Sequence, residues 1–150
     1  IMSLQEGIMS ALKDAMKAKD QTALTALRAV KSAILLAQTE EGAQAELTED
    51  QELKILQKQV KQRKDSAAIY LVQGREDLAT PELAEAEIIS QFLPVALSDE
   101  DVEKVVVNII SQVGAQGMKD MGKVMGLVSK ELAGQADGKT ISNIVKARLS

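Results

Sequence analysis

The chain has 150 residues and a formal net charge of −4, and it contains neither cysteine nor histidine. These absences exclude disulfides, thiolate zinc sites, a cysteine nucleophile and any imidazole base or ligand. Tyr70 and Phe92 are the only aromatic residues, so the core must be aliphatic, which is typical of packed helices and predicts an all-α fold.

Apolar residues at helical spacing predict two helices at the start of the chain. The first ends near Lys19 and should bury Leu4, Ile8, Leu12 and Met16. Asp20 can cap the second, which should end around Gly42 and bury Leu27, Val30, Ile34 and Ala37.

Two further helices follow, and two of the four helices in this part of the chain should pair as a long hairpin. Thr48 and Gln51 form a capping box that opens a helix ending near Gly74. Its inward residues should be Leu53, Leu56, Val60, Ala67 and Leu71. Thr80 and Pro81 then indicate a cap with proline in the first turn, although a start near Asp77 with a kink is the alternative.

A proline-containing link, FLPVALSDED, separates this part from the rest of the chain. Ser98 in this link is a predicted N-cap with three acids in the first turn of the next helix. We therefore expect an N-terminal four-helix subdomain over residues 2–95 and a C-terminal three-helix bundle over residues 96–150.

The stretch GMKDMGKV, residues 117–124, contains most of a phosphate-binding loop, G-x-x-x-x-G-K-[ST]. Such a loop follows a buried strand, and the valine-rich segment before it has a strand-like composition. Its apolar residues instead recur at helical spacing: Val102, Val105, Val106, Ile109, Ile110 and Val113. Val124 also replaces the hydroxyl that would bind Mg²⁺. We therefore predict a helix ending at Gly114, and neither a nucleotide nor another cofactor.

Two short helices should complete the chain. Gly122 and Gly126 are expected to allow close approach of another helix, beside Met121, Met125, Val128 and Leu132. The last helix should start near Asp137 or Thr140 and bury Ile141, Ile144, Val145 and Leu149.

The segment KDMGKVMGLVSKELAGQADGKTISNIVKARL, residues 119–149, resembles the tail domain of the B subunit of the glutamine-dependent aminoacyl-tRNA amidotransferase. It is more similar still to the stand-alone proteins of the GatB/YqeY family. LRAVKSAI, KQRKDSAAIY, GREDLA and FLPVALSDEDVE extend the resemblance over residues 2–150.

The resemblance implies an all-α protein whose second part is a tRNA-contacting appendage. The family is associated with carbon–nitrogen ligase activity that uses glutamine as amide donor, but neither the glutaminase signature nor the ATP-binding cradle has a counterpart here. We predict no catalytic residue and no metal site. Asp65 near Arg63 and Lys64, and the group Glu82, Glu85 and Glu87, are interpreted as solvated helix faces with ion pairs.

Charge is uneven along the chain, which favours an RNA interface in the second part. Residues 114–150 carry six bases against three acids, and six minus three gives a local charge of +3. The candidate tRNA-binding residues are Lys119, Lys123, Lys139, Asn143 and Lys146, and the helix start at residues 138–140 could donate N–H groups to a phosphate. A second basic stripe comprises Lys54, Lys58 and Lys61.

The alternative is a protein-interaction module that binds amidotransferase subunits or another translation complex. Met118, Met121 and Met125 would then form an exposed, adaptable surface. No apolar run approaches the ~18–20 residues that span a bilayer, and the N-terminus lacks the apolar region of a signal peptide. We therefore expect a cytoplasmic protein with no membrane partner.

Overall fold

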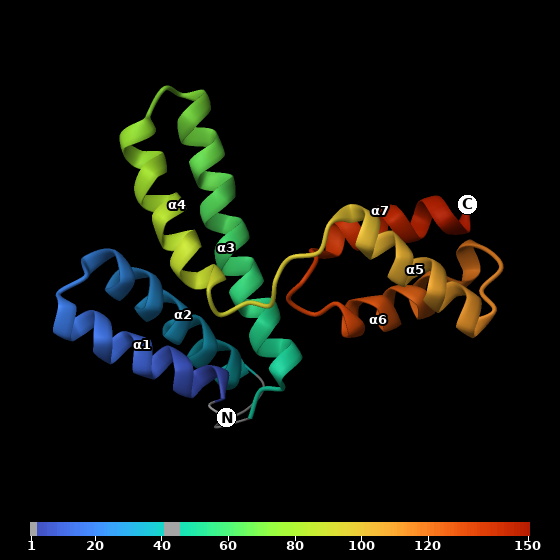
Figure 1. Cartoon of the computed structure of the whole chain (residues 1–150), viewed down its shortest axis with the longest axis horizontal. Coiled ribbons are helices and arrows are strands. Elements are labelled where there is room, and N and C mark those ends of the chain that lie inside the picture. The colour runs from blue at the N-terminus through green and yellow to red at the C-terminus, as the bar shows by residue number, and fades with distance from the viewer. Residues whose placement is uncertain (1–2, 41–45) are drawn as a thin grey trace. The chain divides into compact units, whose positions relative to one another are not determined.

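The computed structural model describes residues 3–40 and 46–150, and in these ranges it contains α-helices and one 3₁₀ turn but no strand (Figure 1). The predicted all-α class is confirmed. The helices belong to two compact units, the first ending at Leu93 and the second beginning at Pro94. Each unit has its own apolar core.

The first unit begins with the helix pair α1 (Leu4–Ala18) and α2 (Gln21–Glu40). Lys19 ends α1 in the left-handed region, with φ 56°. Asp20 Oδ1 then accepts a hydrogen bond from the Ala23 N–H at 3.1 Å, so Asp20 caps α2 as predicted. The predicted end of α2 near Gly42 lies outside the described residues.

The helices α3 (Glu49–Val72) and α4 (Glu76–Ser90) form the predicted hairpin (Figure 1). The capping box is confirmed, because the Gln51 N–H donates to Thr48 Oγ1 at 3.2 Å and the Thr48 N–H donates to Gln51 Oε1 at 2.8 Å. Gly74, with φ 73°, provides the left-handed backbone that turns the chain into α4.

The predicted cap of α4 at Thr80 is wrong. The helix begins at Glu76 and runs through Pro81, close to the alternative start at Asp77. Thr80 Oγ1 donates to the Glu76 carbonyl at 3.0 Å, as a residue inside a helix does. Proline removes one helical hydrogen bond, whereas continuing the helix lets Ala79 pack as tightly as Ala86 and Ile89 further along.

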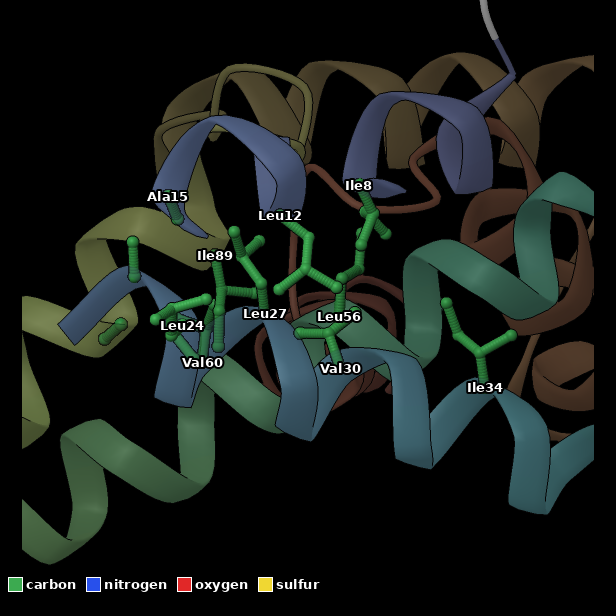
Figure 2. Packing of buried hydrophobic residues seen from close by; sticks show 13 residues of the cluster. Ile8, Leu12, Ala15, Leu24, Leu27, Val30, Ile34, Leu56, Val60 and Ile89 are labelled. Carbon is green, nitrogen blue, oxygen red and sulfur yellow. The ribbon is translucent and has the colours of Figure 1, made fainter. Parts of the chain in front are cut away.

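The core of the first unit is aliphatic and draws on all four helices (Figure 2). Its labelled members in the figure include Ile8 and Leu12 of α1, Leu27 and Val30 of α2, and Leu56 of α3. Two residues expected in this core are exposed instead. Met16 is 56% exposed because the small Ala15 takes the inward position at that turn. Leu71 is 52% exposed because it lies one turn beyond Ala67, the last residue of α3 that is buried.

The second unit consists of α5 (Asp99–Val113), the 3₁₀ turn η1 (Met118–Asp120), α6 (Met121–Glu131) and α7 (Gly138–Leu149). Ser98 caps α5 by accepting from the Asp101 N–H at 3.2 Å, and Gly114 ends it with φ 67°. The predicted helix is confirmed, so the GMKDMGKV stretch follows a helix and lacks the strand of a phosphate-binding loop.

A buried cluster from α5, α6 and α7 joins the three helices, and it includes Val106, Val124 and Val145. The expectation for Gly122 and Gly126 is wrong. Both glycines are exposed, and a Cβ built on either would have no neighbour within 4 Å among the described residues. They lie on the side of α6 opposite the valines, so no helix of this unit packs against them.

Candidate nucleic-acid interface

Three of the predicted RNA-binding residues share one face of α7. Lys139, Asn143 and Lys146 follow one another at spacings of i, i+4 and i+7, and all three are exposed. The opposite face holds Val145 in the core. The helix therefore presents two ammonium groups and one amide together to solvent.

Arg148, the other cation near the end of α7, lies on a different face of the helix. Arg148 forms an ion pair with Glu103 of α5. An α-helix turns about 100° per residue, so Lys139, nine residues earlier, lies on the opposite side of α7. Lys139 and Lys146 thus point away from α5, and Arg148 does not belong to their surface.

Lys119 lies on η1 and Lys123 on α6, and both are exposed. Lys130 lies seven residues after Lys123 on the same exposed face of α6, so it joins Lys123 on that face although it was not among the candidates. Its i+7 spacing from Lys123 is the sequence signal that could have identified it. Within residues 3–40 and 46–150, none of these three lysines forms an ion pair.

The exposed glycines lie on this same side of α6. Gly126 lies between Lys123 and Lys130 in the sequence, and Gly122 is adjacent to Lys123. Because neither glycine has a side chain, the helix backbone is bare beside the lysines. A partner can approach this part of α6 more closely than it could approach a fully substituted helix.

The start of α7 is less available to a phosphate than the sequence suggested. Asp137 caps the helix, and its Oδ1 accepts from the Thr140 N–H at 2.7 Å. The Thr140 N–H is therefore already paired within the helix cap. The Asp137 carboxylate also adds negative charge at this helix end, which opposes an anion there.

The secondary basic stripe lies in the first unit. Lys54, Lys58 and Lys61 are exposed along one face of α3 at i, i+4 and i+7. Lys61 Nζ lies 2.8 Å from Asp65 Oδ2, so part of its charge is already compensated within the helix.

The methionines of the second unit do not form the exposed surface that the alternative requires. Met118 is 43% exposed, but Met121 and Met125 are half-buried and pack against the core. Their positions on the inner side of α6 account for them as core residues.

Two of the nominated carboxylates form ion pairs of different kinds. Asp65 pairs with Lys61 within α3 on an exposed face, as expected. Glu85 of α4 instead pairs with Arg63 of α3 and is only 16% exposed, so the solvated face expected for it is wrong. Within the described ranges, no three His, Cys, Asp or Glu residues are grouped so as to hold a metal ion. In the same ranges, every helix is too short or too polar to cross a bilayer.

Comparison with known proteins gives one family match and several relatives. The model of the family described as Yqey-like protein matches residues 5–149. The chain is 37% identical over 124 residues to Altered inheritance of mitochondria protein 41, mitochondrial, of Clavispora lusitaniae, which covers 81% of this chain and 69% of that protein. The protein of the same name from Kluyveromyces lactis is 34% identical over 139 residues, which is 91% of this chain and 70% of the relative.

A similarity over a shorter segment links the chain to an amidotransferase. One subunit of the glutamyl-tRNA(Gln) amidotransferase of Thermococcus gammatolerans is 33% identical over 73 residues, which is 46% of this chain but only 12% of that protein. The similarity therefore concerns a small part of the amidotransferase polypeptide.

Proposed function

Because the chain belongs to the YqeY-like protein family, we propose that it is an accessory tRNA-binding module, related to an amidotransferase tail but without that enzyme's active site. The similarity to one segment of an amidotransferase polypeptide supports this role. The short match gives no basis for assigning amide transfer to this chain.

The observation that carries the proposal is the set of exposed lysines on η1, α6 and α7 that lack a described acidic partner. Neighbouring cations are compensated: Arg148 pairs with Glu103, and Lys104 lies 3.9 Å from Asp101. The uncompensated lysines are Lys119, Lys123, Lys130, Lys139 and Lys146. Lysines arranged in this way bind phosphates by displacing counterions.

The composition of the second unit determines which features of RNA it can recognise. Both aromatic residues, Tyr70 and Phe92, belong to the first unit, so the second unit has no aromatic side chain on which a base could stack. Binding would depend on the phosphate backbone and the folded shape of the RNA. Asn143 is exposed between the two lysines of α7 and would contact a 2′-hydroxyl. The bare backbone at Gly126 lets the RNA approach α6 closely.

The test is a fluorescence titration of labelled, folded tRNA with the full chain at several salt concentrations. Four to five phosphate contacts should give a slope of log K against log salt of about −3 to −4. The double variant Lys123→Glu/Lys139→Glu should lose binding while keeping its helical circular dichroism. The control variant Lys104→Glu changes an exposed lysine of α5 and should bind within about twofold of wild type.

Binding that survives the double reversal would refute the site, and absence of binding at low salt would refute the function. Amidotransferase subunits are the next partners to test, although the half-buried Met121 and Met125 weaken the methionine surface proposed for them. The cytoplasmic location stays a prediction, and the fungal relatives carry the word mitochondrial in their names.

A further inference from the structure

The face of α1 and α2 that carries Met9 and Leu35 holds an apolar pocket of about 70 Å³. It is lined by Gln5, Ile8 and Met9 of α1 and by Lys31, Ile34 and Leu35 of α2. Figure 2 shows Ile8 pointing from α1 toward α2, and Ile34 pointing from α2 toward α1. No described residue of α3 or α4 lines the pocket, so it opens on the outer face of the helix pair.

Apolar side chains surround this pocket on the surface. Met9 is 38% exposed and Leu35 is 53% exposed. Met16 lies two turns after Met9 on the same face of α1 and is also exposed. Together they form an apolar strip that no described residue covers, and such strips mark interaction sites on soluble proteins.

Cations flank the strip on both helices. Lys13 lies between Met9 and Met16 on α1, and Arg28 and Lys31 lie within two turns of Leu35 on α2. All three are exposed, and none forms an ion pair with another described residue.

Acids are scarce on this side of the pair. Between Gln21 and Thr39, α2 has none, and Asp14 of α1 lines a different pocket with α4. Among the described residues of the two helices, Glu6 lies one turn before Met9, and Glu40 lies at the end of α2, five residues after Leu35. The three cations outnumber these two acids, so the strip carries a net positive charge.

We propose that this outer face of α1 and α2 binds an acidic amphipathic helix of a partner protein. One aliphatic side chain of that helix enters the pocket, and carboxylates one turn away pair with Lys13, Arg28 and Lys31. A groove between two packed helices accepts a third helix through spaced apolar anchors, and the surrounding charges select its sign.

Two other anionic partners fit this face less well. An RNA backbone would cover Met9, Met16 and Leu35 without filling an apolar pocket, so it would gain little from them. A membrane surface would use the cations but has no need of a pocket sized for one side chain. The pocket is about half the volume of the ~150 Å³ cavity that holds benzene, which suits a single aliphatic group.

The test uses the full chain with ¹³C-methyl methionine and a stapled alanine-based helix as the probe. The probe carries one leucine with glutamates one turn to either side. We expect saturable shifts of the Met9 and Met16 methyl signals. The signals of Met118, Met121 and Met125 lie in the other unit and act as internal controls. Probes with glutamine for glutamate, or alanine for leucine, should bind at least about tenfold more weakly.

Two variants of adjacent residues make the test specific. Leu35→Glu places a carboxylate at the pocket and should weaken binding by at least about tenfold. Leu36→Glu makes the same change at a 62% exposed position that does not line the pocket, and it should have less than about a twofold effect.

Equal binding by both variants, or by the glutamine probe, would overturn the proposal. The proposal would also be overturned if vesicles of anionic lipid shifted the Met9 and Met16 methyl signals and the probe helix did not. The proposal is independent of tRNA binding, since Lys123→Glu/Lys139→Glu should leave helix binding unchanged.

Discussion

Arg63 of α3 and Glu85 of α4 form an ion pair across the hairpin, with Arg63 Nε 3.2 Å from Glu85 Oε1. Arg63 Nη1 also donates to Gln59 Oε1 at 2.7 Å and to the Gln59 carbonyl at 3.1 Å. The two charged side chains are only 13% and 16% exposed, whereas those of the Lys61–Asp65 pair are 58% and 62% exposed. The less exposed pair therefore connects two helices, while the other lies within one helix.

Glu85→Ala should lower the free energy of unfolding by about 1–3 kcal/mol, because it leaves Arg63 mostly buried without its carboxylate. The matched change Asp65→Ala removes an exposed partner and should cost at most about 0.5 kcal/mol. Urea unfolding of both variants measures the difference. Equal losses would show that the hairpin does not depend on the interhelical pair.

Gly126→Ala should stabilise the protein by up to about 1 kcal/mol, because alanine is the better helix former and its Cβ would have no neighbour within 4 Å. Gly114→Ala should instead destabilise it by about 1–2 kcal/mol, because φ at this position is +67°. The two midpoints of thermal unfolding should move in opposite directions. A destabilising Gly126→Ala would mean that the folded protein covers that face of α6.

Leu56→Ala should cost about 2–5 kcal/mol, since Leu56 is fully buried in the core of the first unit. The second unit has a separate core, so its native methyl signals from Met118, Met121 and Met125 should persist when the first unit unfolds. Methyl NMR during urea unfolding follows both units. Simultaneous loss of all signals would show that the two cores unfold together.

The pKa of the Asp77 carboxyl is lowered, mainly by the side-chain hydrogen bonds that Arg75 donates at 3.0 Å. A lowered pKa means that the associated stability is present above the unfolded pKa and is lost as pH falls through the folded pKa. Arg75→Gln should raise the Asp77 pKa toward its ordinary value, and carboxyl NMR titration measures it. An unchanged pKa would exclude Arg75 as the main cause.

The helices were predictable because local signals and packing agree along most of the chain. Ser98 with its three acids, Gly114, and the periodicity that includes Val102, Val106 and Ile109 all favour α5. The start of α4 was misjudged because Pro81 suggests a first turn, while burial of Ala79 stabilises a longer helix. That burial depends on a neighbouring helix, which local sequence does not reveal.

The sequence predicts which residues of the candidate site share a helix face, but it does not predict which groups lie beside them. Periodicity places Lys139, Asn143 and Lys146 on one face of α7, and the structure agrees. The sequence does not show that Asp137 takes the Thr140 N–H, although Asp three residues before Thr is a usual capping spacing. Nor does it show that Gly122 and Gly126 face solvent, because small residues suit both close packing and open surfaces.

The hairpin also carries the only tyrosine in a chain without tryptophan. Tyr70 is half-buried near the end of α3, three residues after the buried Ala67. Intrinsic emission excited near 280 nm therefore comes from one turn of this hairpin, and the second unit contributes none. Tyr70 emission thus reports on the opening of α3 and α4 from a single site. RNA binding by the lysines of the second unit can be detected only with an added label.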